Sequence, residues 1–507
     1  MVHGNWLAKW ALVAPQKKAI VDLASGRSFT YAELNGRADR LAALLMKRFG
    51  VGFGDRVAVI GANRIEQVDL LFALGKLGAM LVPINWRLSP GEVAFILKDC
   101  EPKLLLWSAD VSATAKALKD GLFDGQMVGL DDQGEAGFGA LLAQYDANDP
   151  ALAITTEGIV EDTPLLLLYT SGTTGRPKGA LLTHGTVTWN AVNTSTGWDL
   201  RHDDVTITHT PFFHTGGWNV LTLPLLHRGA TVVLAERFDP GETLRAIGEQ
   251  GVTVLFAVPT MFQMMLDDPA LASASLGSVR FFISGGAPCP IPLIEAFAKR
   301  GVTFKQGYGL TEVGPNCFVL DARDAIRKAG AVGFPVLHLD TRIVDSSGRE
   351  VARGVVGELQ LRGPTVCAGY FRNPEATAKA KSADGWFSTG DLFRQDEEGY
   401  HYVVGRLKEM YISGGENVYP AEVERVLYQL EAVIEAAVVG VPDERWGEVG
   451  RAFVALDPKI GPKPSPEEIL AHCRANLARY KVPKHLTILE SLPKGPSGKI
   501  LKQALVS

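Results

Sequence analysis

The chain has 507 residues, of which 46% are hydrophobic and 21% are charged, proportions typical of a soluble globular protein. Because a single hydrophobic core stops growing at roughly 250 to 300 residues, we expect at least two domains. The 51 basic and 56 acidic residues give a formal net charge of -5, and without a basic surplus nothing argues for a nucleic-acid partner.

The sequence favours a cytoplasmic protein. Residues 1–15 predict a small amphipathic helix rather than a signal peptide, because Lys9 interrupts a short apolar run. No run approaches the roughly 18 to 20 apolar residues of a membrane span, although peripheral membrane contact and a homodimer both stay open. The five cysteines predict neither a disulfide framework nor a zinc site, since they lie far apart with no C-x-x-C pair: Cys100, Cys289, Cys317, Cys367 and Cys473.

Short apolar runs alternate with helical patterns over most of the first 400 or so residues, which predicts an α/β protein with largely parallel sheets. Thr30 and Glu33 form a capping-box pattern ahead of a helix that ends near Arg48, and residues 90–99 predict another helix. The expected strands are residues 57–60, 104–107, 165–169, 232–234, 252–258, 281–283 and 302–305.

The pattern of apolar and turn residues changes twice in the last third of the chain. Residues 331–362 form short valine-rich segments broken by turn signals, which predicts a β-rich subdomain. After Gly405 the pattern predicts helices at 420–430 and 465–480 and strands at 435–441 and 452–456. We therefore expect a large N-terminal domain of stacked α/β sheets with the β-rich subdomain, residues 1–405, and a small α+β C-terminal domain, residues 406–507.

Residues 165–179, LLLLYTSGTTGRPKG, run from an apolar strand into a loop rich in glycine, serine and threonine. Such a loop exposes many backbone N–H groups and hydroxyls, and glycine lets the backbone approach a ligand closely, which suits phosphate oxygens. Lys178 adds a cation and Pro177 stiffens the exit, but the spacing is not that of a Walker A loop. A plain surface turn is the weaker alternative because the loop follows the LLLL strand directly.

The segment YTSGTTGRPKG at 169–179 resembles the phosphate-loop motif of the adenylate-forming superfamily, which includes acyl-CoA synthetases, non-ribosomal peptide adenylation domains and firefly luciferases. Companion motifs follow in that family's order: SGGAP at 284–288, QGYGLTE at 306–312, STGD at 388–391, GRLKEM at 405–410, SGGENVYPAEVE at 413–424 and PSGK at 496–499. The resemblance covers nearly the whole chain and implies a C-terminal domain that moves between two half-reactions.

The resemblance also implies a nucleotide site. Tyr308, between two glycines, offers a flat face for adenine, with a core tyrosine as the alternative. Asp391 fits the two ribose hydroxyls, although aspartate after glycine is often only a turn residue. The implied nucleotide-binding residues are Thr170, Ser171, Gly172, Thr173, Thr174, Gly175, Lys178, Gly285, Gly286, Ala287, Gly307, Tyr308, Gly309, Thr311, Asp391, Arg406 and Lys499.

Three of these residues are expected to be catalytic: Lys499, Lys178 and Glu312. A divalent cation that bridges nucleotide phosphates prefers carboxylate and hydroxyl oxygens, and the family pattern makes Glu312 and Thr174 the Mg²⁺ pair. Lys499 would by itself be a solvated charge, but the resemblance implies that it reaches the α-phosphate and the substrate carboxylate and stabilises charge in the transition state.

The implied reaction activates a carboxylic acid with ATP as an acyl-adenylate and then transfers the acyl group to coenzyme A. The pivot of the C-terminal domain aligns with Lys408. The resemblance also implies a CoA tunnel, whose residues are Ser413, Gly414, Gly415, Glu416 and Trp446. The alternatives are that Gly414 and Gly415 form a plain turn and that Trp446 is an ordinary packed tryptophan.

Acid specificity is expected to depend on PFFHTGGWN at 211–219 and on the region 258–262. The implied acyl pocket consists of His214, Gly216, Gly217, Trp218, Val258 and Gly309. No ionisable side chain stands at 216 or 217, which disfavours an amino acid. Plant-type hydroxycinnamate ligases carry a bulky aromatic residue where Gly216 stands, so a medium- to long-chain fatty acid is the first choice; Trp218 and Phe213 packing an aromatic acid is the alternative.

Three rival functions differ in class. An acyl-AMP ligase that loads a carrier protein typically has an insertion in the large domain, which is not seen here. A luciferase-like oxygenase shares every nucleotide motif, so only an assay for light or oxygen uptake separates it. A non-enzymatic nucleotide-binding protein has no need of Lys499, the pivot and the glycine tunnel together.

Overall fold

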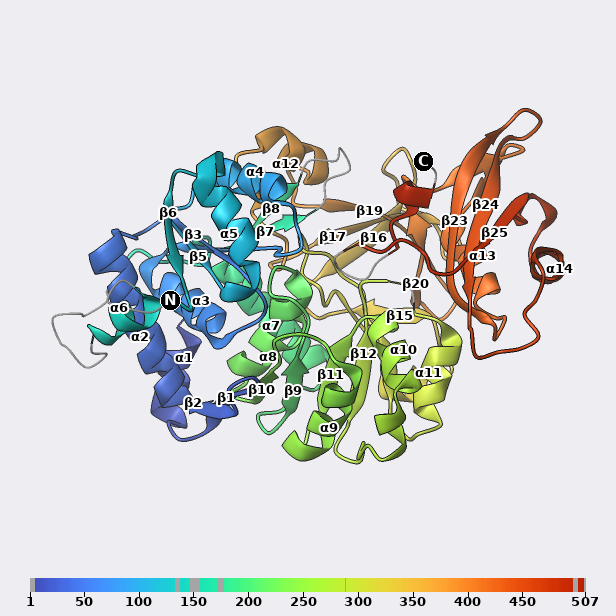
Figure 1. Ribbon diagram of the computed structural model, residues 1–507. Coiled ribbons are helices and arrows are strands. Elements are labelled where there is room, and N and C mark those ends of the chain that lie inside the picture. Colours follow the sequence, from blue (N-terminus) through green and yellow to red (C-terminus); the bar gives the residue numbers. More distant parts are fainter. Residues whose placement is uncertain are drawn as a thin grey trace.

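The computed structural model describes residues 5–132, 137–145, 156–170, 177–287, 289–495 and 500–505. The architecture is mixed α/β, with a large N-terminal part and a smaller C-terminal part, and this confirms the predicted fold class. Figure 1 shows the N-terminal part as layers of sheet and helix and the C-terminal strands and helices at one end of the molecule.

The largest sheet has seven strands in the order β18-β8-β7-β4-β3-β5-β6. The strands from β7 to β6 pair in parallel, whereas β7 and β8 form an antiparallel hairpin. The bounds are β3 (Arg56–Ile60), β4 (Met80–Ile84), β5 (Leu104–Trp107), β6 (Gln126–Gly129), β7 (Pro164–Thr170), β8 (Lys178–Thr183) and β18 (Gly369–Tyr370).

This sheet is buried on both faces. Val57 and Val59 of β3 join one hydrophobic cluster, and the alternate residues Ala58 and Ile60 join another on the opposite face. A strand that is covered on both sides carries apolar residues at successive positions, which explains why its strands appear in the sequence as short continuous apolar runs.

Two smaller sheets complete the α/β part. One has the order β2-β1-β10-β9 and the other β11-β12-β13, and β11 to β13 are all parallel. The bounds are β1 (Lys18–Asp22), β2 (Arg27–Thr30), β9 (Val205–Thr208), β10 (Thr231–Leu234), β11 (Val254–Ala257), β12 (Phe281–Ser284) and β13 (Phe304–Gln306).

Helices cover these sheets (Figure 1). The capping box predicted for α2 is present, since Thr30 Oγ1 accepts from Glu33 N at 3.2 Å and Glu33 Oε2 accepts from Thr30 N at 2.8 Å. The helices are α1 (Trp6–Val13), α2 (Tyr31–Phe49), α3 (Ile65–Leu77), α4 (Pro90–Cys100), α5 (Ser112–Ala117), α6 (Phe138–Ala143), α7 (His184–Gly197), α8 (Thr222–His227), α9 (Pro240–Gln250), α10 (Pro259–Asp267), α11 (Ile291–Ala298), α12 (Pro374–Ala380), α13 (Pro420–Leu427) and α14 (Pro466–Asn476). None of the helices in the described ranges combines the length and hydropathy needed to cross a bilayer.

The β-rich segment forms an antiparallel sheet of six strands in the order β14-β15-β20-β19-β17-β16. Its bounds are β14 (Phe318–Val319), β15 (Ala331–Pro335), β16 (Asp340–Val344), β17 (Gly357–Arg362), β19 (Phe387–Gln395) and β20 (His401–Arg406). The β-rich structure predicted for residues 331–362 is therefore confirmed.

The C-terminal part contains β21 (Tyr411–Ser413), β22 (Glu416–Val418), β23 (Val433–Asp443), β24 (Gly447–Leu456) and β25 (His485–Leu489) with α13 and α14. Its own hydrophobic cluster includes Leu427, Val438 and Ile469. Two helices end earlier than predicted. The helix expected to reach 430 ends at Leu427. The helix expected to reach 480 ends at Asn476, because Leu477 adopts an extended backbone. Strand bounds also shift: the strand expected at 302–305 is β13, and the strand expected at 452–456 begins earlier as β24.

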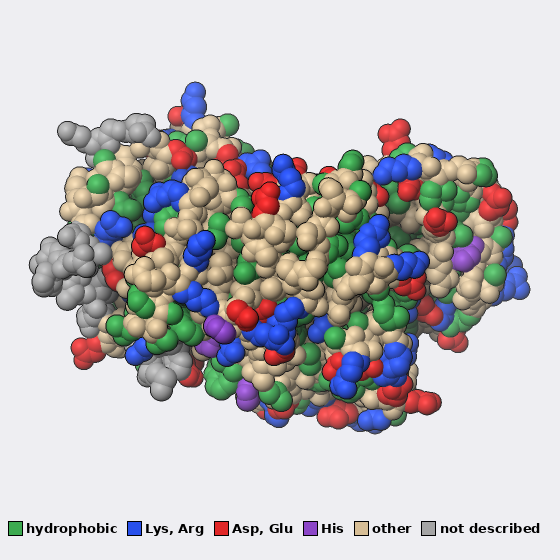
Figure 2. All heavy atoms as spheres, turned by 90° about the horizontal axis from the view of Figure 1, so that it is seen from below, with side chains coloured by type: hydrophobic (Ala, Val, Ile, Leu, Met, Phe, Trp, Pro, Cys, Tyr) green, Lys and Arg blue, Asp and Glu red, His purple; other side chains and the backbone are tan. Residues whose placement is uncertain are grey.

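The molecular surface carries mixed charge. Figure 2 shows basic and acidic side chains interspersed over the face seen from below, in keeping with the near-balance of charges in the sequence.

Four phenylalanines form the centre of the core between β11–β13 and helices α9 to α11. Phe282 is fully buried, and its ring centroid lies 5.2 Å from that of Phe262 and 5.3 Å from that of Phe297. Phe282→Ala should lower the free energy of unfolding by about 3 to 5 kcal/mol, because it removes an aromatic side chain from a packed core. Chemical denaturation of the full chain measures this. Phe53→Ala is the control, since Phe53 is 64% exposed, and equal losses in the two variants would contradict the prediction.

Candidate functional site

Three of the predicted nucleotide motifs come directly after strands of two sheets. Along the sequence, residues 171–176 follow β7, Gly285 follows β12, and Gly307 follows β13. In open α/β sheets, ligands bind at the carboxyl ends of parallel strands. Gly307 N donates to Ser284 O at 2.7 Å, so the loops after β12 and β13 are joined directly.

Glu312 connects three segments that are far apart in the sequence. Thr170 Oγ1, at the end of β7, donates to Glu312 Oε1 at 3.2 Å, and the Tyr370 hydroxyl donates to the same oxygen at 3.1 Å. Lys178 lies on the same side of the site, with its Nζ 5.2 Å from the centroid of the Tyr370 ring. Burial, followed by the nearby Glu312 carboxylate, raises the pKa of Tyr370, which keeps the hydroxyl protonated as a donor.

The β7–β8 hairpin holds the two ends of the predicted phosphate loop. Thr170 and Lys178 are directly paired across the hairpin, and Thr170 Oγ1 also lies 3.4 Å from Lys178 O. The predicted loop residues between them lie outside the described residues: Ser171, Gly172, Thr173, Thr174 and Gly175. Lys499 lies outside them as well.

The second group of site residues joins Tyr308 to Asp391 and Arg406. The Tyr308 hydroxyl donates to Asp391 Oδ2 at 2.6 Å, and Arg406 Nε lies 3.0 Å from Asp391 Oδ1. Asp391 is 4% exposed and directly opposite Arg406 in the β19–β20 pair. Burial and the Asp391 charge raise the pKa of Tyr308 well above its usual value, so Tyr308 remains a donor.

The Tyr308 ring is held edge-on by Phe393, whose ring centroid is 4.7 Å away, and by Phe318 at 5.9 Å. The ring is half-buried. This support fixes the orientation of the ring, and adenine stacking on it stays a prediction.

Two predicted site glycines have backbone constraints of different kinds. A Cβ at Gly309 would lie 2.4 Å from Gly314 O and 2.3 Å from the carbonyl carbon of Pro315, so the loop after Tyr308 has no room for a side chain. Gly286 has φ 81°, a left-handed conformation that glycine adopts readily. Ala287 follows it, and Thr311 lies in the loop between Gly309 and Glu312.

The predicted acyl-pocket residues do not share one environment. Trp218 is fully buried and stacks on Phe212 at 3.9 Å, so its ring lies in the core. A Cβ at Gly217 would meet Pro211 O at 2.5 Å. His214 N donates to Pro211 O at 3.0 Å, and Val258 precedes α10.

Phe256, on β11, is a wall residue that the sequence reasoning missed. A Cβ at Gly216 would lie 3.2 Å from its ring and 3.2 Å from Thr210 Cγ2, and a Cβ at Gly285 would lie 3.4 Å from the same ring. The half-buried Phe256 ring therefore borders both glycines. The sequence placed Phe256 in the predicted strand 252–258, which was the one available indication. The sequence does not show how this strand packs, so it could not predict that the ring faces residues 216 and 285.

The predicted CoA-tunnel residues come together in the C-terminal sheet. Gly414 and Gly415 form the turn between β21 and β22 with φ 61° and 88°. Gly414 N donates to Trp446 O at 2.8 Å, and a Cβ at Gly414 would lie 2.8 Å from the Trp446 ring. Ser413 pairs with Glu416 across this turn, and Trp446 is 41% exposed.

Lys408 is exposed in the turn directly after β20. On one side, Leu407 N donates to Gly390 O at 2.9 Å. On the other side, Lys502 Nζ bridges Glu409 at 3.0 Å and Glu424 of α13 at 2.7 Å. Burial lowers the pKa of Lys502, but Glu424 and Glu409 outweigh it and hold the pKa above its usual value.

A magnesium ion fits the Glu312 carboxylate only as one ligand of a shared site. No hydrogen bond from a described residue reaches Glu312 Oε2, because both donors use Oε1. Across the described ranges, no cluster of three or more His, Cys, Asp or Glu side chains is able to hold a metal. The remaining ligands would be Thr174, nucleotide phosphate oxygens and water, which Mg²⁺ accepts readily.

Two family models match most of the chain. The family model described as "AMP-binding enzyme" matches residues 7–371, and that described as "AMP-binding enzyme C-terminal domain" matches residues 422–499. The chain is 42% identical to a feruloyl-CoA synthase of Amycolatopsis sp over 503 residues, covering 98% of this chain and 97% of the relative. It is 42% identical to an indoleacetate–CoA ligase of Aromatoleum aromaticum over 507 residues, covering 99% and 97%.

A more distant relative, the long-chain-fatty-acid–CoA ligase FadD13 of Mycobacterium tuberculosis, is 36% identical over 502 residues, covering 99% of this chain and 97% of the relative. Among solved structures, the O-succinylbenzoate coenzyme A synthetase (MenE) of Bacillus subtilis in complex with ATP and magnesium ion is similar with a TM-score of 0.86. It is 31% identical and covers 99% of each chain.

Gly309→Ala should reduce acid-dependent ATP–pyrophosphate exchange by about 100-fold, because the added Cβ collides with backbone and shifts Tyr308 and Glu312, and a displacement near 1 Å costs that much. Gly91→Ala on α4 is the control, since a Cβ there meets nothing within 4 Å. An exchange rate for Gly309→Ala within about twofold of the unmodified chain would show that the loop tolerates the shift.

Proposed function

The chain belongs to the AMP-binding enzyme family, and from this premise we propose that it joins an aromatic carboxylic acid to coenzyme A. It is an ATP-dependent, AMP-forming acid–thiol ligase. The observation that carries the aromatic substrate is the pair of 42%-identical relatives, one named for a feruloyl group and one for indoleacetate.

The first half-reaction forms a phosphorus–oxygen bond. A carboxylate oxygen of the acid attacks the α-phosphorus of ATP, the bond to the bridging oxygen breaks, and pyrophosphate leaves. Lys178, at the exit of the phosphate loop, would stabilise the departing charge, and Lys499 would stabilise charge at the α-phosphate. Glu312 would help to hold Mg²⁺, which supplies positive charge to phosphate oxygens when it is bound.

The second half-reaction forms the thioester. The sulfur of coenzyme A attacks the acyl carbonyl carbon, the bond to the AMP oxygen breaks, and the thiol proton leaves to solvent. Gly414 and Gly415 would let the pantetheine arm pass, because a side chain there would narrow the path. A rotation of the C-terminal part about Lys408 would bring this turn to the acyl-adenylate.

An aromatic ring beside Gly216 supports an aromatic acid. A Cβ added at Gly216 would lie only 3.2 Å from the Phe256 ring and 3.2 Å from Thr210 Cγ2, so both side chains lie close to this glycine. An aromatic ring such as Phe256 favours offset or edge-to-face packing with the ring of a bound acid.

A medium- to long-chain fatty acid, the first choice from the sequence, becomes the second candidate. The observation in its favour is the 36% identity to the long-chain-fatty-acid–CoA ligase. Loading of a carrier protein in place of coenzyme A is a more remote alternative.

A pyrophosphate-release screen should rank hydroxycinnamates, benzoates and indoleacetate above fatty acids of 6 to 16 carbons by kcat/KM. Phe256→Leu should lower kcat/KM for the aromatic acids by roughly 2- to 10-fold, because ring–ring contacts contribute about 0.5 to 1.5 kcal/mol. Phe53→Leu, on the surface, should leave the ranking unchanged. A preference for long fatty acids that Phe256→Leu does not alter would refute the aromatic assignment.

The two half-reactions should separate by mutation. Lys499→Ala should reduce acyl-AMP formation by about 100- to 1,000-fold, because a transition-state contact is lost, while transfer from supplied acyl-AMP to coenzyme A continues. Gly415→Leu should do the reverse. Separate assays of pyrophosphate release and thioester formation measure this.

Gly354→Leu controls for the strain of a side chain at positive φ, since Gly354 has φ 83° and, like Gly415 at 88°, open space around it. If Lys499→Ala or Gly415→Leu slowed both half-reactions equally, the role assigned to that residue would be contradicted.

A further inference from the structure

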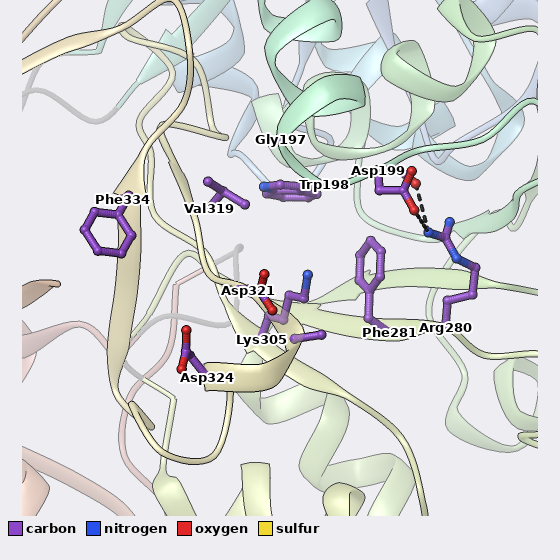
Figure 3. A pocket seen from close by; sticks show the side chains of 11 residues that line it. Gly197, Trp198, Asp199, Arg280, Phe281, Lys305, Val319, Asp321, Asp324 and Phe334 are labelled. Carbon is purple, nitrogen blue, oxygen red and sulfur yellow. Dashed lines mark hydrogen bonds and ion pairs between the residues drawn. The ribbon is translucent and has the colours of Figure 1, made fainter.

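A cavity of about 620 Å³ has none of the expected nucleotide-binding residues in its lining, although its residue Lys305 stands two residues before Gly307. It is bordered by the end of α7, the beginning of β12, β13 and the segment from β14 to Asp324. Figure 3 shows the Trp198 ring on one side, with Phe281 and Lys305 facing it from the other. A concave, partly aromatic space of this size is typical of small-molecule sites.

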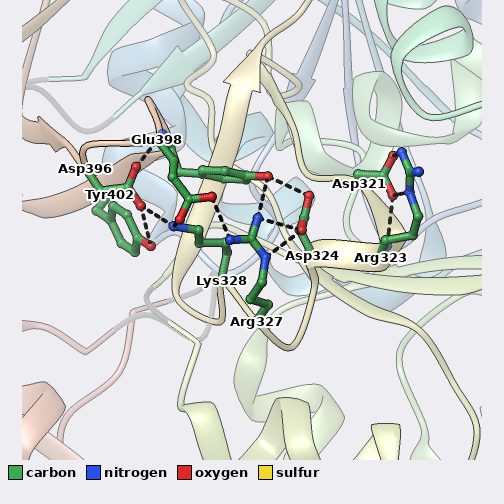
Figure 4. Close-up of polar contacts among 9 residues, drawn as sticks. Asp321, Arg323, Asp324, Arg327, Lys328, Asp396, Glu398 and Tyr402 are labelled. Atoms are coloured by element: carbon green, nitrogen blue, oxygen red, sulfur yellow. Dashed lines mark hydrogen bonds and ion pairs between the residues drawn. The ribbon is translucent and has the colours of Figure 1, made fainter.

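Most charges around this cavity are paired with one another. Arg280 contacts Asp204 at 2.7 Å and Asp199 at 2.8 Å. Asp321 pairs with Arg323 at 3.1 Å and Asp324 with Arg327 at 2.8 Å, within the network of ion pairs in Figure 4. These acidic groups are therefore already neutralised by arginines of the same chain.

Lys305 is the exception. It is only 8% exposed, and no hydrogen bond or ion pair joins its ammonium group to any residue that the structure describes. Its Nζ lies 4.7 Å from the centroid of the Phe281 ring, and Figure 3 places the amine at the cavity. Burial lowers the pKa of Lys305, with Asp321 acting in the opposite direction, so an added anion would stabilise the charged form.

The geometry points to a second ligand site, at Lys305, for a small organic carboxylate with an aromatic body. The ammonium group provides the contact for the carboxylate, and the rings of Trp198 and Phe281, which pack edge-to-face at 6.4 Å, form one apolar wall together. The aromatic side chains favour an organic carboxylate over inorganic phosphate, because phosphate has no apolar surface to bury against them.

This cavity is separate from the expected acyl pocket. Its wall residue Phe281 begins β12, whereas Gly285, next to Phe256, follows the end of that strand, roughly 13 Å away at the usual rise per residue. Lys305 lies on the same face of this sheet as Phe256, because Phe256, Ile283 and Lys305 are register partners, so the separation rests on the distance along the strands. Binding here would therefore leave the reaction site free.

Equilibrium dialysis of radiolabelled benzoate against the full chain tests this site. The reaction site is first saturated with a sulfamoyl mimic of benzoyl-adenylate, so that remaining binding reports the cavity. We expect one further equivalent of benzoate to bind. Lys305→Met should weaken this binding by at least about tenfold, since a charge-assisted hydrogen bond is lost, and Lys305→Arg should largely retain it. Lys299→Met, at the exposed end of α11, should leave it unchanged.

Several results would overturn the assignment. They are the absence of benzoate binding to the blocked chain, undiminished binding by Lys305→Met, and competition by inorganic phosphate equal to that of benzoate. Benzamide, which lacks the charge, should bind at least tenfold more weakly. If Lys305→Met fails to fold, Val319→Trp decides, because it fills the cavity from the opposite wall without removing the ammonium group.

Discussion

The arrangement of the site depends on the hydrogen bonds that converge on Glu312. One carboxylate oxygen accepts from Thr170 and from Tyr370, and the main-chain carbonyl of Glu312 accepts from Cys367 N at 2.7 Å. Hydrogen bonds to a charged acceptor contribute about 1.5 to 3 kcal/mol each, more than neutral ones. They tie the β7–β8 hairpin, the loop after β13 and the segment from Cys367 to Tyr370 into one unit, so the groups expected to meet the nucleotide are held in place by the protein itself.

Features that depend on local sequence were predictable, and features that depend on distant pairing were not. The strand that precedes the phosphate loop and the cap formed by Thr30 and Glu33 follow from neighbouring residues, and both are present. The direction of Phe256 depends on how β11 packs against segments near residues 216 and 285. Trp218 was expected to line the acyl pocket. Its ring stacks on Phe212, and the neighbouring residues in the sequence do not predict this contact. The order of the motifs along the chain was enough to identify the family, whereas the surroundings of Gly216 and Trp218 depend on tertiary contacts.

The glycines of the expected acyl pocket illustrate the same limit. Gly216, Gly217 and Gly309 were all expected to line the acyl pocket. In the structure, no side chain fits at Gly217 or Gly309, because backbone atoms lie within 2.5 Å of the position that a Cβ would take. At Gly216, the atoms nearest to that position belong to side chains. A larger residue at Gly216 would meet movable groups, and one at the other two would displace the main chain. Pocket shape can therefore change at Gly216 and Phe256 without disturbing the loop that holds Tyr308.

A different set of contacts gives a physical reason for a pivot at Lys408. Leu407 is attached to β19 through Gly390, and Glu409 is attached to α13 through Lys502. Lys408 is the residue between these two anchors, and the turn across it is closed by bonds from Glu409 N and Met410 N to Arg406 O at 3.0 and 3.1 Å. A rotation that opens only this turn would carry α13 and the Gly414–Gly415 turn together while Asp391 and Arg406 stay paired on β19 and β20. The nucleotide contacts would then survive the movement that exchanges one half-reaction for the other.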